Sequence, residues 1–157
     1  GGTMSSEVSA QYDKIYKYCY FKTGDAVLAE DITQETFLRF YKAGKYHERG
    51  KVMAYLYTIA ANLIKDSYRN KKTFPAAEPL DENIQASAED VDTSLAVRLA
   101  VEKLDEDEKE VIVLLVINGQ SVGETADIMG ISRFSVYRTQ KRALKKLKNI
   151  LGGDFYG

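Results

Sequence analysis

The chain has 157 residues, a formal net charge of −1, 45% hydrophobic residues and one cysteine. A balance this close to neutral excludes a protein that binds polyanions through its overall charge, so attraction to nucleic acid must come from local patches. One cysteine excludes a disulfide framework within the chain, and no run reaches the roughly 18 apolar residues of a membrane span. No secretory signal pattern precedes the first predicted helix, so we expect a cytoplasmic protein.

Charge divides the chain into three segments. Residues 1–72 hold 12 Lys and Arg against 8 Asp and Glu, a net charge of +4. Residues 73–97 hold six acids, both prolines and no Lys or Arg, whereas residues 98–157 carry a net charge of +1. We interpret the middle segment as an acidic linker between two small helical domains, because a structureless stretch of about 20 residues is uncommon inside one compact domain. A long surface loop of a single domain is the alternative, and helical periodicity on both sides predicts an all-α fold.

The first domain, residues 1–72, is predicted to contain three helices. Apolar residues recur at helical spacing over about residues 8–21, and Gly24 interrupts the pattern. Asp25 can cap a second helix that runs to about residue 42, and a third covers about residues 52–72. The expected apolar members of the second helix are Leu28, Ile32, Phe37, Phe40 and Tyr41. The expected core stripe of the third helix is Leu56, Ile59, Ala60, Leu63 and Ser67.

Two residues of the first domain could carry chemistry. Cys19 lies between two tyrosines in an apolar helical stretch, so we interpret it as a buried thiol rather than a redox sensor or nucleophile. His47 has no His, Cys or acid at metal-ligand spacing, so we interpret it as a loop residue. The sequence predicts no catalytic residue, no metal and no cofactor.

The second domain, residues 98–157, is expected to have its first helix start near Ser94 and include Leu95, Leu99 and Leu104. Asp105 with Glu108 can cap the next helix. Residues 111–117 are apolar on most sides, which predicts either the core helix of a small domain or part of a protein contact. The dipeptide Asn118-Gly119 is expected to end that helix.

A helix-turn-helix is predicted over residues 121–151. Ser121 and Glu124 form a capping box that starts one helix, and Gly130 supplies the positive φ that ends it. Ser132 can cap the second helix at once, so about three residues join the two helices. Ala126 lies midway along the first helix, where a small side chain allows the second helix to pack closely.

Positive charge gathers on the second of these helices. Residues 131–151 carry seven Lys and Arg and no acid, whereas residues 99–130 carry eight acids against two Lys. A solvated basic face on an ordinary amphipathic helix would explain the charge alone. Its position in a helix-turn-helix favours DNA binding.

Two separated motifs resemble one protein family. The first domain contains AEDITQETFLRF at residues 29–40 and YLYTIAANL at residues 55–63, and the second contains the helix-turn-helix followed by Arg142-Ala143-Leu144. Together they resemble regions 2 and 4 of the extracytoplasmic-function (ECF) sigma factors of bacterial RNA polymerase, over nearly the whole chain from Met4. The resemblance implies a subunit without catalysis of its own that binds core polymerase, recognises promoter DNA and promotes strand opening.

The second helix of the first domain resembles the part of region 2 that grips the clamp of the polymerase β′ subunit. The residues that match the motif are Asp31, Gln34, Glu35 and Leu38. Positions 31, 35 and 38 fall independently on one helical face, and Leu38 is an apolar residue on a polar stripe. A solvated acidic face with one stray leucine is the alternative.

Residues 44–51 and the third helix resemble the part of region 2 that reads and opens the minus-ten promoter element. Opening requires a place for an unstacked base and cations along the exposed strand. The candidate residues are Tyr46, His47, Arg49, Lys51, Asn62, Lys65 and Arg69. Two positions depart from the family pattern, because Tyr55 replaces a common tryptophan and Ala61 replaces a basic residue that often precedes the motif asparagine.

The recognition-helix positions of region 4 are occupied by Arg133, Phe134, Ser135, Tyr137, Arg138, Lys141 and Arg142. Those near the helix N-terminus are expected to face base edges of the minus-thirty-five element in the major groove, and the later cations are expected to hold phosphates. Lys145, Lys146 and Lys148 are expected to contact phosphate or solvent. Phe134 can touch a thymine methyl or simply pack.

The resemblance also implies protein partners. The apolar residues 111–117 would form the core and part of a surface for the polymerase β flap, and an anti-sigma factor is a further expected partner. The acidic segment 73–97 would run toward the RNA exit channel or serve as a plain tether.

Two other function classes remain open from the residues themselves. A free-standing helix-turn-helix regulator would bind DNA without polymerase, although the motif at residues 29–40 argues against it. An enzyme could use the carboxylates of Glu30, Asp31 and Glu35 to bind a metal, but no His, Cys or glycine-rich phosphate loop accompanies them.

Overall fold

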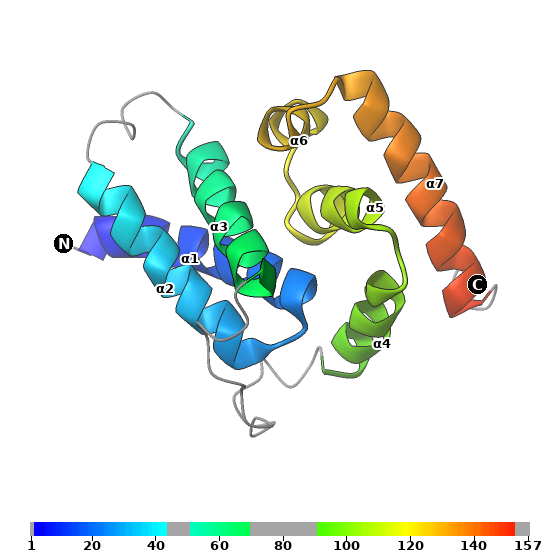
Figure 1. The fold of residues 1–157 in the computed structure, drawn as a ribbon, viewed down its shortest axis with the longest axis horizontal. Helices are drawn as coiled ribbons and strands as arrows, with labels where there is room; N and C mark the ends of the chain where they lie inside the picture. Colours follow the sequence, from blue (N-terminus) through cyan, green and yellow to red (C-terminus); the bar gives the residue numbers. More distant parts are fainter. Residues whose placement is uncertain (1, 44–50, 70–90, 153–157) are drawn as a thin grey trace. The chain divides into compact units, whose positions relative to one another are not determined.

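The computed structural model describes residues 2–43, 51–69 and 91–152, and the regular secondary structure within those ranges is helical. The chain divides into two compact units, Gly1–Glu78 and Pro79–Gly157 (Figure 1). The all-α, two-domain prediction is therefore confirmed. Most of the predicted acidic linker, residues 73–90, lies outside the described residues. Its last residues differ from the prediction, because α4 (Val91–Glu102) already begins at Val91.

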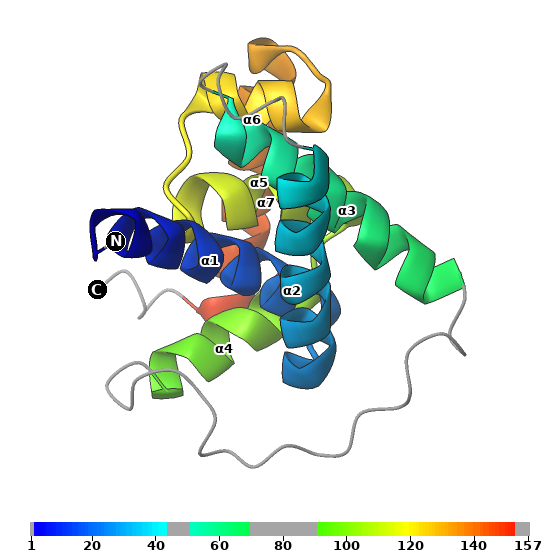
Figure 2. The same ribbon diagram turned by 90° about the vertical axis from the view of Figure 1, so that its left-hand side faces the viewer.

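The first unit consists of α1 (Gly2–Thr23), α2 (Ala26–Ala43) and α3 (Val52–Arg69), and each helix packs on the other two. Figure 2 shows α1 running across α2. Gly24 has a φ of +72°, which ends α1 in the left-handed region. The Asp25 carboxylate then accepts the Leu28 backbone N–H at 3.0 Å, which confirms the predicted cap of α2.

Aromatic residues fill much of the core of the first unit. Tyr18 and Tyr57 are fully buried, and their rings meet edge to face with centroids 5.1 Å apart. The predicted core stripe of α3 was too narrow, because Tyr57 and Ile64 are also buried. Tyr41, one of the predicted apolar members of α2, is exposed.

The second unit consists of α4, α5 (Glu106–Val111), η4 (Ile112–Ile117), α6 (Val122–Met129) and α7 (Arg133–Leu151). Helix α7 packs on the other four elements. The apolar run predicted as one helix continues from α5 as the π-helical turn η4, and the Asn118 N–H bonds to the Val113 carbonyl at 2.9 Å. Gly119, with a φ of +71°, follows that turn, so the predicted end is confirmed.

Candidate nucleic-acid interface

Residues 121–133 form the turn geometry that the sequence predicts. The Ser121 hydroxyl accepts the Glu124 N–H at 3.0 Å, and a Glu124 carboxylate oxygen accepts the Ser121 N–H at 3.0 Å. Gly130 ends α6 with a φ of +70°, and the Ser132 hydroxyl accepts the Ser135 N–H at 3.0 Å to start α7. Figure 1 shows the short turn between α6 and α7. These local bonds confirm the predicted helix-turn-helix.

The packing of α6 on α7 depends on small side chains at the crossing. Ala126 of α6 is buried together with Val136 of α7 and Val111 of α5. Partly buried apolar residues surround this cluster, namely Leu115, Val122, Met129 and Ile131. The predicted packing of the second helix across Ala126 is therefore confirmed.

The N-terminal half of α7 carries an exposed aromatic and basic face. Phe134 is 68% exposed, and Tyr137 is 57% exposed. The guanidinium carbon of Arg138 lies 5.6 Å from the centre of the Phe134 ring, so the aromatic face partly orients the cation. Arg133 and Lys141 are also exposed, whereas Ser135 is partly buried beside the cap. Exposed apolar rings beside cations suit contacts to thymine methyls and phosphates.

The structure gives Arg142 a different environment from the other predicted recognition residues. Its Nε donates to Glu108 Oε2 at 2.8 Å, and its Nη2 lies 3.0 Å from Asp107 Oδ2. The hydrogen bond to Glu108 is the main cause of the raised pKa of the Arg142 guanidinium. Lys146, one turn later, is likewise held by Glu108. Both partners come from α5, 34 or more residues earlier, so spacing along the sequence gave no signal of them.

The four residues of the predicted clamp face lie along α2. Asp31 and Gln34 are exposed, and Glu35 forms an ion pair with Arg39 at 2.9 Å. Leu38 is 57% exposed. Tyr41, which the sequence predicted only as an apolar member of this helix, is exposed one turn beyond Leu38 and extends the apolar part of this face. An exposed apolar pair next to carboxylates has the composition of a protein-contact surface.

The predicted minus-ten residues are only partly within the described chain. Asn62, Lys65 and Arg69 share one exposed face of α3, and Arg69 lies 3.7 Å from Asp66. Lys51 is exposed directly before this helix. Tyr46, His47 and Arg49 lie outside the described residues. The structure therefore brings three of the seven candidates together on a single helix face.

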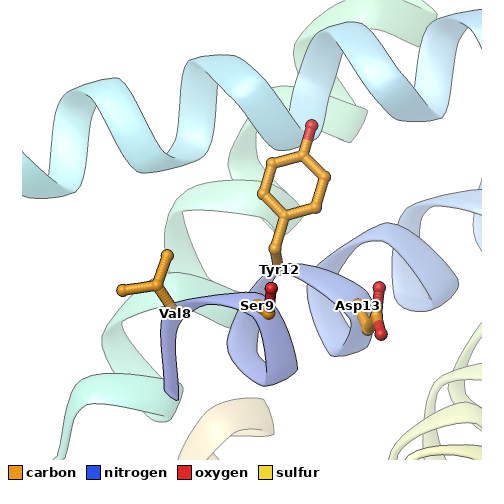
Figure 3. A pocket seen from close by; sticks show the side chains of 4 residues that line it. All are labelled: Val8, Ser9, Tyr12 and Asp13. Carbon is orange, nitrogen blue, oxygen red and sulfur yellow. The ribbon is translucent and has the colours of Figure 1, made fainter. Parts of the chain in front are cut away.

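A partly buried polar contact joins α1 to the start of the clamp face. The Tyr12 hydroxyl donates to Glu30 Oε2 at 2.7 Å, and Gln34 Nε2 donates to the same oxygen at 3.0 Å. Figure 3 shows the Tyr12 ring pointing from α1 toward α2, beside a hollow that Val8, Ser9 and Asp13 also line. Burial and the bond to Glu30 raise the pKa of Tyr12 above its usual range, so it stays a hydrogen-bond donor.

The one cysteine of the chain lies in the core of the first unit. Cys19 is buried, as predicted, and burial raises the pKa of its thiol to about 12. Among residues 2–43, 51–69 and 91–152 no group of three or more His, Cys, Asp or Glu is arranged to hold a metal ion. Over the same ranges, none of the helices has the length and hydrophobicity needed to span a membrane.

Two family models match the chain. The model of sigma-70 region 2 matches residues 8–74, and the model of sigma-70 region 4 matches residues 94–147. The chain is 36% identical over 152 residues to the ECF RNA polymerase sigma factor BldN of Streptomyces coelicolor, and 31% identical over 134 residues to the RNA polymerase sigma factor CarQ of Myxococcus xanthus. The chain belongs to the ECF sigma factors.

The extent of these matches differs between relatives. The BldN alignment covers 90% of this sigma factor but 58% of BldN, and the CarQ alignment covers 82% of this sigma factor and 77% of CarQ. A solved structure of CnrH in complex with the cytosolic domain of CnrY is 25% identical, with a TM-score of 0.68 over 98% of this chain and 88% of CnrH. Helices α1–α3 thus lie largely in the match to region 2, and α4 to α7, with the helix-turn-helix of α6 and α7, lie largely in the match to region 4.

Proposed function

We propose that this ECF sigma factor binds core RNA polymerase, directs it to promoter DNA and promotes strand opening. The observation that carries the proposal is that three exposed helix faces differ in composition. An acidic and apolar face lies on α2, a polar and basic face on α3, and an aromatic and basic face on α7. Each face suits a different partner, and the chain acts by binding rather than by catalysis.

The α2 face, comprising Asp31, Gln34, Glu35 and Leu38, is proposed to contact the β′ clamp. Leu38 and Tyr41 supply apolar area, and the surrounding carboxylates supply orientation. The test is complex formation between fluorescently labelled chain and purified core polymerase. Leu38→Ser is expected to weaken binding at least tenfold, whereas the exposed α1 substitution Lys17→Ala leaves it unchanged. Equal affinity of the two variants for core polymerase would contradict the proposal that the α2 face contacts the β′ clamp.

The α3 face is proposed to hold the opened minus-ten element. Asn62 can bond to a base edge, and Lys65 and Arg69 can bind phosphates of the exposed strand. Lys51, together with Tyr46, His47 and Arg49 outside the described residues, belongs to the same proposal. Strand opening is measured by permanganate reactivity of promoter thymines. We expect Asn62→Ala to reduce that reactivity without weakening core binding, and unchanged reactivity would contradict the role of this face.

The exposed face of α7 is proposed to read the minus-thirty-five element in the major groove. Its members are Arg133, Phe134, Ser135, Tyr137, Arg138 and Lys141. The prediction for Arg142 changes, because its guanidinium is bound to two acids of α5. Replacing Arg138 is expected to cost about 1–3 kcal/mol of discrimination at one base pair, as measured by competition between duplexes.

Two protein contacts are also proposed. Val116 of η4 is exposed between the partly buried Leu115 and Ile117, and such an apolar residue fits a contact with the β flap. An anti-sigma factor is the second proposed partner, and the solved complex of CnrH with the cytosolic domain of CnrY supports it in so far as a similar chain there binds a second protein. We place these interactions in the cytoplasm, where bacterial polymerase works. The flap contact would be tested by a pull-down of the isolated β flap with the Val116→Glu variant. Retained binding of the flap would contradict the proposed contact.

A further inference from the structure

Glu108 is a fully buried carboxylate in an otherwise exposed acidic segment. Its side chain has 0% exposure, while Asp105, Glu106 and Asp107 are exposed. A buried carboxylate is stable only when hydrogen bonds and cations replace the lost water. Glu108 receives the Asp105 N–H at 2.9 Å, Lys146 Nζ at 2.9 Å and Arg142 Nε at 2.8 Å.

The neighbouring acids extend this arrangement to a cluster that joins α5 to α7. Asp107 lies 3.0 Å from the Arg142 guanidinium, and Asp105 lies 3.5 Å from the Lys146 ammonium. Arg142 and Lys146 are four residues apart, so they project from one face of α7 at successive turns. Two turns of the recognition helix are therefore tied to α5 by ion pairs.

This tied face differs from the exposed face of α7. Phe134, Arg138, Lys141 and Lys145 follow one another at spacings of four, three and four, opposite the buried positions Val136 and Ala143. Within the described ranges no salt bridge pairs Arg138, Lys141 or Lys145 with an acid. The seven cations of residues 131–151 thus include two that already have anionic partners inside the domain.

We propose that Glu108 is a positioning residue, which fixes α7 on α5 and keeps Arg142 and Lys146 out of the DNA contact. The inference rests on the proposed function of α7. Moving either cation to a phosphate would leave the Glu108 carboxylate with one charged partner fewer, and removing one partner of a buried ion pair is strongly destabilising. Asp105 and Asp107 repel phosphates on the same side, so the cluster marks one edge of the DNA footprint.

The test measures how promoter binding depends on salt. A duplex is selected from a randomised library by polymerase holoenzyme carrying the wild-type chain, and its affinity is measured by fluorescence anisotropy from low to high salt. Each phosphate contact contributes about 0.9 to the slope of log affinity against log salt. Lys141→Ala is expected to lower the slope by about 0.9, whereas the matched substitution Lys146→Ala leaves it unchanged.

The salt-dependence slope of Glu108→Gln separates a positioning role from a merely structural one, because loss of a merely structural residue would leave the slope unchanged. Glutamine keeps the size and the cap but loses the charge, so Arg142 and Lys146 keep only their exposed partners Asp107 and Asp105. Exposed ion pairs are weak and exchange readily for phosphates, so the slope is expected to steepen by about 0.9 for each cation that turns to the DNA. Equal losses of slope in Lys141→Ala and Lys146→Ala would overturn the proposal, as would an unchanged slope in folded Glu108→Gln. If Glu108→Gln does not fold, the matched lysine pair decides alone.

Failure of the proposed DNA-binding function of α7 would give a different result from failure of this inference. Wild-type holoenzyme would then select no duplex from the library, and this inference would fall with it. The overturning results above all arise while wild-type holoenzyme still binds its selected duplex.

Discussion

Gly130 and Gly123 lie seven residues apart in the same helix-turn-helix, and replacing each by alanine is expected to change stability in opposite directions. Gly130 has a φ of +70°, and a Cβ built on it meets nothing within 4 Å. The cost of replacing Gly130 by alanine is therefore conformational rather than steric. An L-residue in the left-handed region costs about 1–2 kcal/mol, and the smaller entropy of the unfolded alanine chain returns about 0.4–1 kcal/mol. Gly130→Ala should lower the free energy of unfolding by about 1 kcal/mol.

Gly123 lies within α6 and has no positive φ. A Cβ there would come 3.0 Å from Nη2 of Arg133, which is the far end of a flexible side chain and can move. Alanine favours a helix over glycine by about 0.5–1 kcal/mol. Gly123→Ala should therefore raise the free energy of unfolding by about 0.5 kcal/mol.

Native-state hydrogen exchange isolates this unit from the other one in the full chain. The amides of Val136 and Ala143 report opening of the second unit, and a loss of 1 kcal/mol should speed their exchange about fivefold. Gly130→Asn should speed it less than Gly130→Ala, because asparagine tolerates the left-handed region. Equal effects of Gly130→Ala and Gly123→Ala, or no effect of Gly130→Ala, would refute the conformational argument.

Three further predictions concern other parts of the molecule. Tyr57→Ala should lower the free energy of unfolding by about 3–5 kcal/mol in urea melts, whereas the exposed Tyr41→Ala stays within about 0.5 kcal/mol; comparable losses would contradict the assigned core. Burial raises the pKa of Cys19 to about 12, so iodoacetamide at pH 8 should label it only after unfolding, and rapid native labelling would refute the burial. Burial alone would raise the pKa of Glu108, but hydrogen bonds from the Asp105 backbone and from the two cations of α7 lower it below the usual range of a glutamate. The stability that wild type gains over Glu108→Gln should thus be full at pH 7 and shrink as pH falls through the acidic range in which the Glu108 carboxylate takes up a proton, and a pH-independent difference in urea melts would contradict it.

Local signals in the sequence were sufficient for the helix-turn-helix. A capping box is formed by two residues three positions apart, and a helix-ending glycine is recognised from a single position. Ser121, Glu124 and Gly130 could therefore be assigned correctly from the sequence. The same is true of Asp25 at the start of α2.

Features that depend on distant residues could not be predicted. Glu108 was expected only to cap α5, and its bond to Arg142 joins residues 34 positions apart. The burial of Tyr57 also depends on a distant residue, because a tyrosine is compatible with both surface and interior and its ring packs against Tyr18 of another helix. The early start of α4 was missed because its acidic first turn resembles the linker composition before it.

Run-off transcription tests the central claim most directly. Purified bacterial core polymerase is combined with the chain and a panel of upstream sequences, in parallel with Leu38→Ser and with the double variant Arg138→Ala/Lys141→Ala. We predict promoter-dependent transcripts with the wild-type chain, which the first variant loses through failed core binding and the second through failed promoter recognition. If no core polymerase yields a transcript while the chain alone still shifts a specific duplex, the protein is a free-standing regulator and the sigma-factor account is wrong.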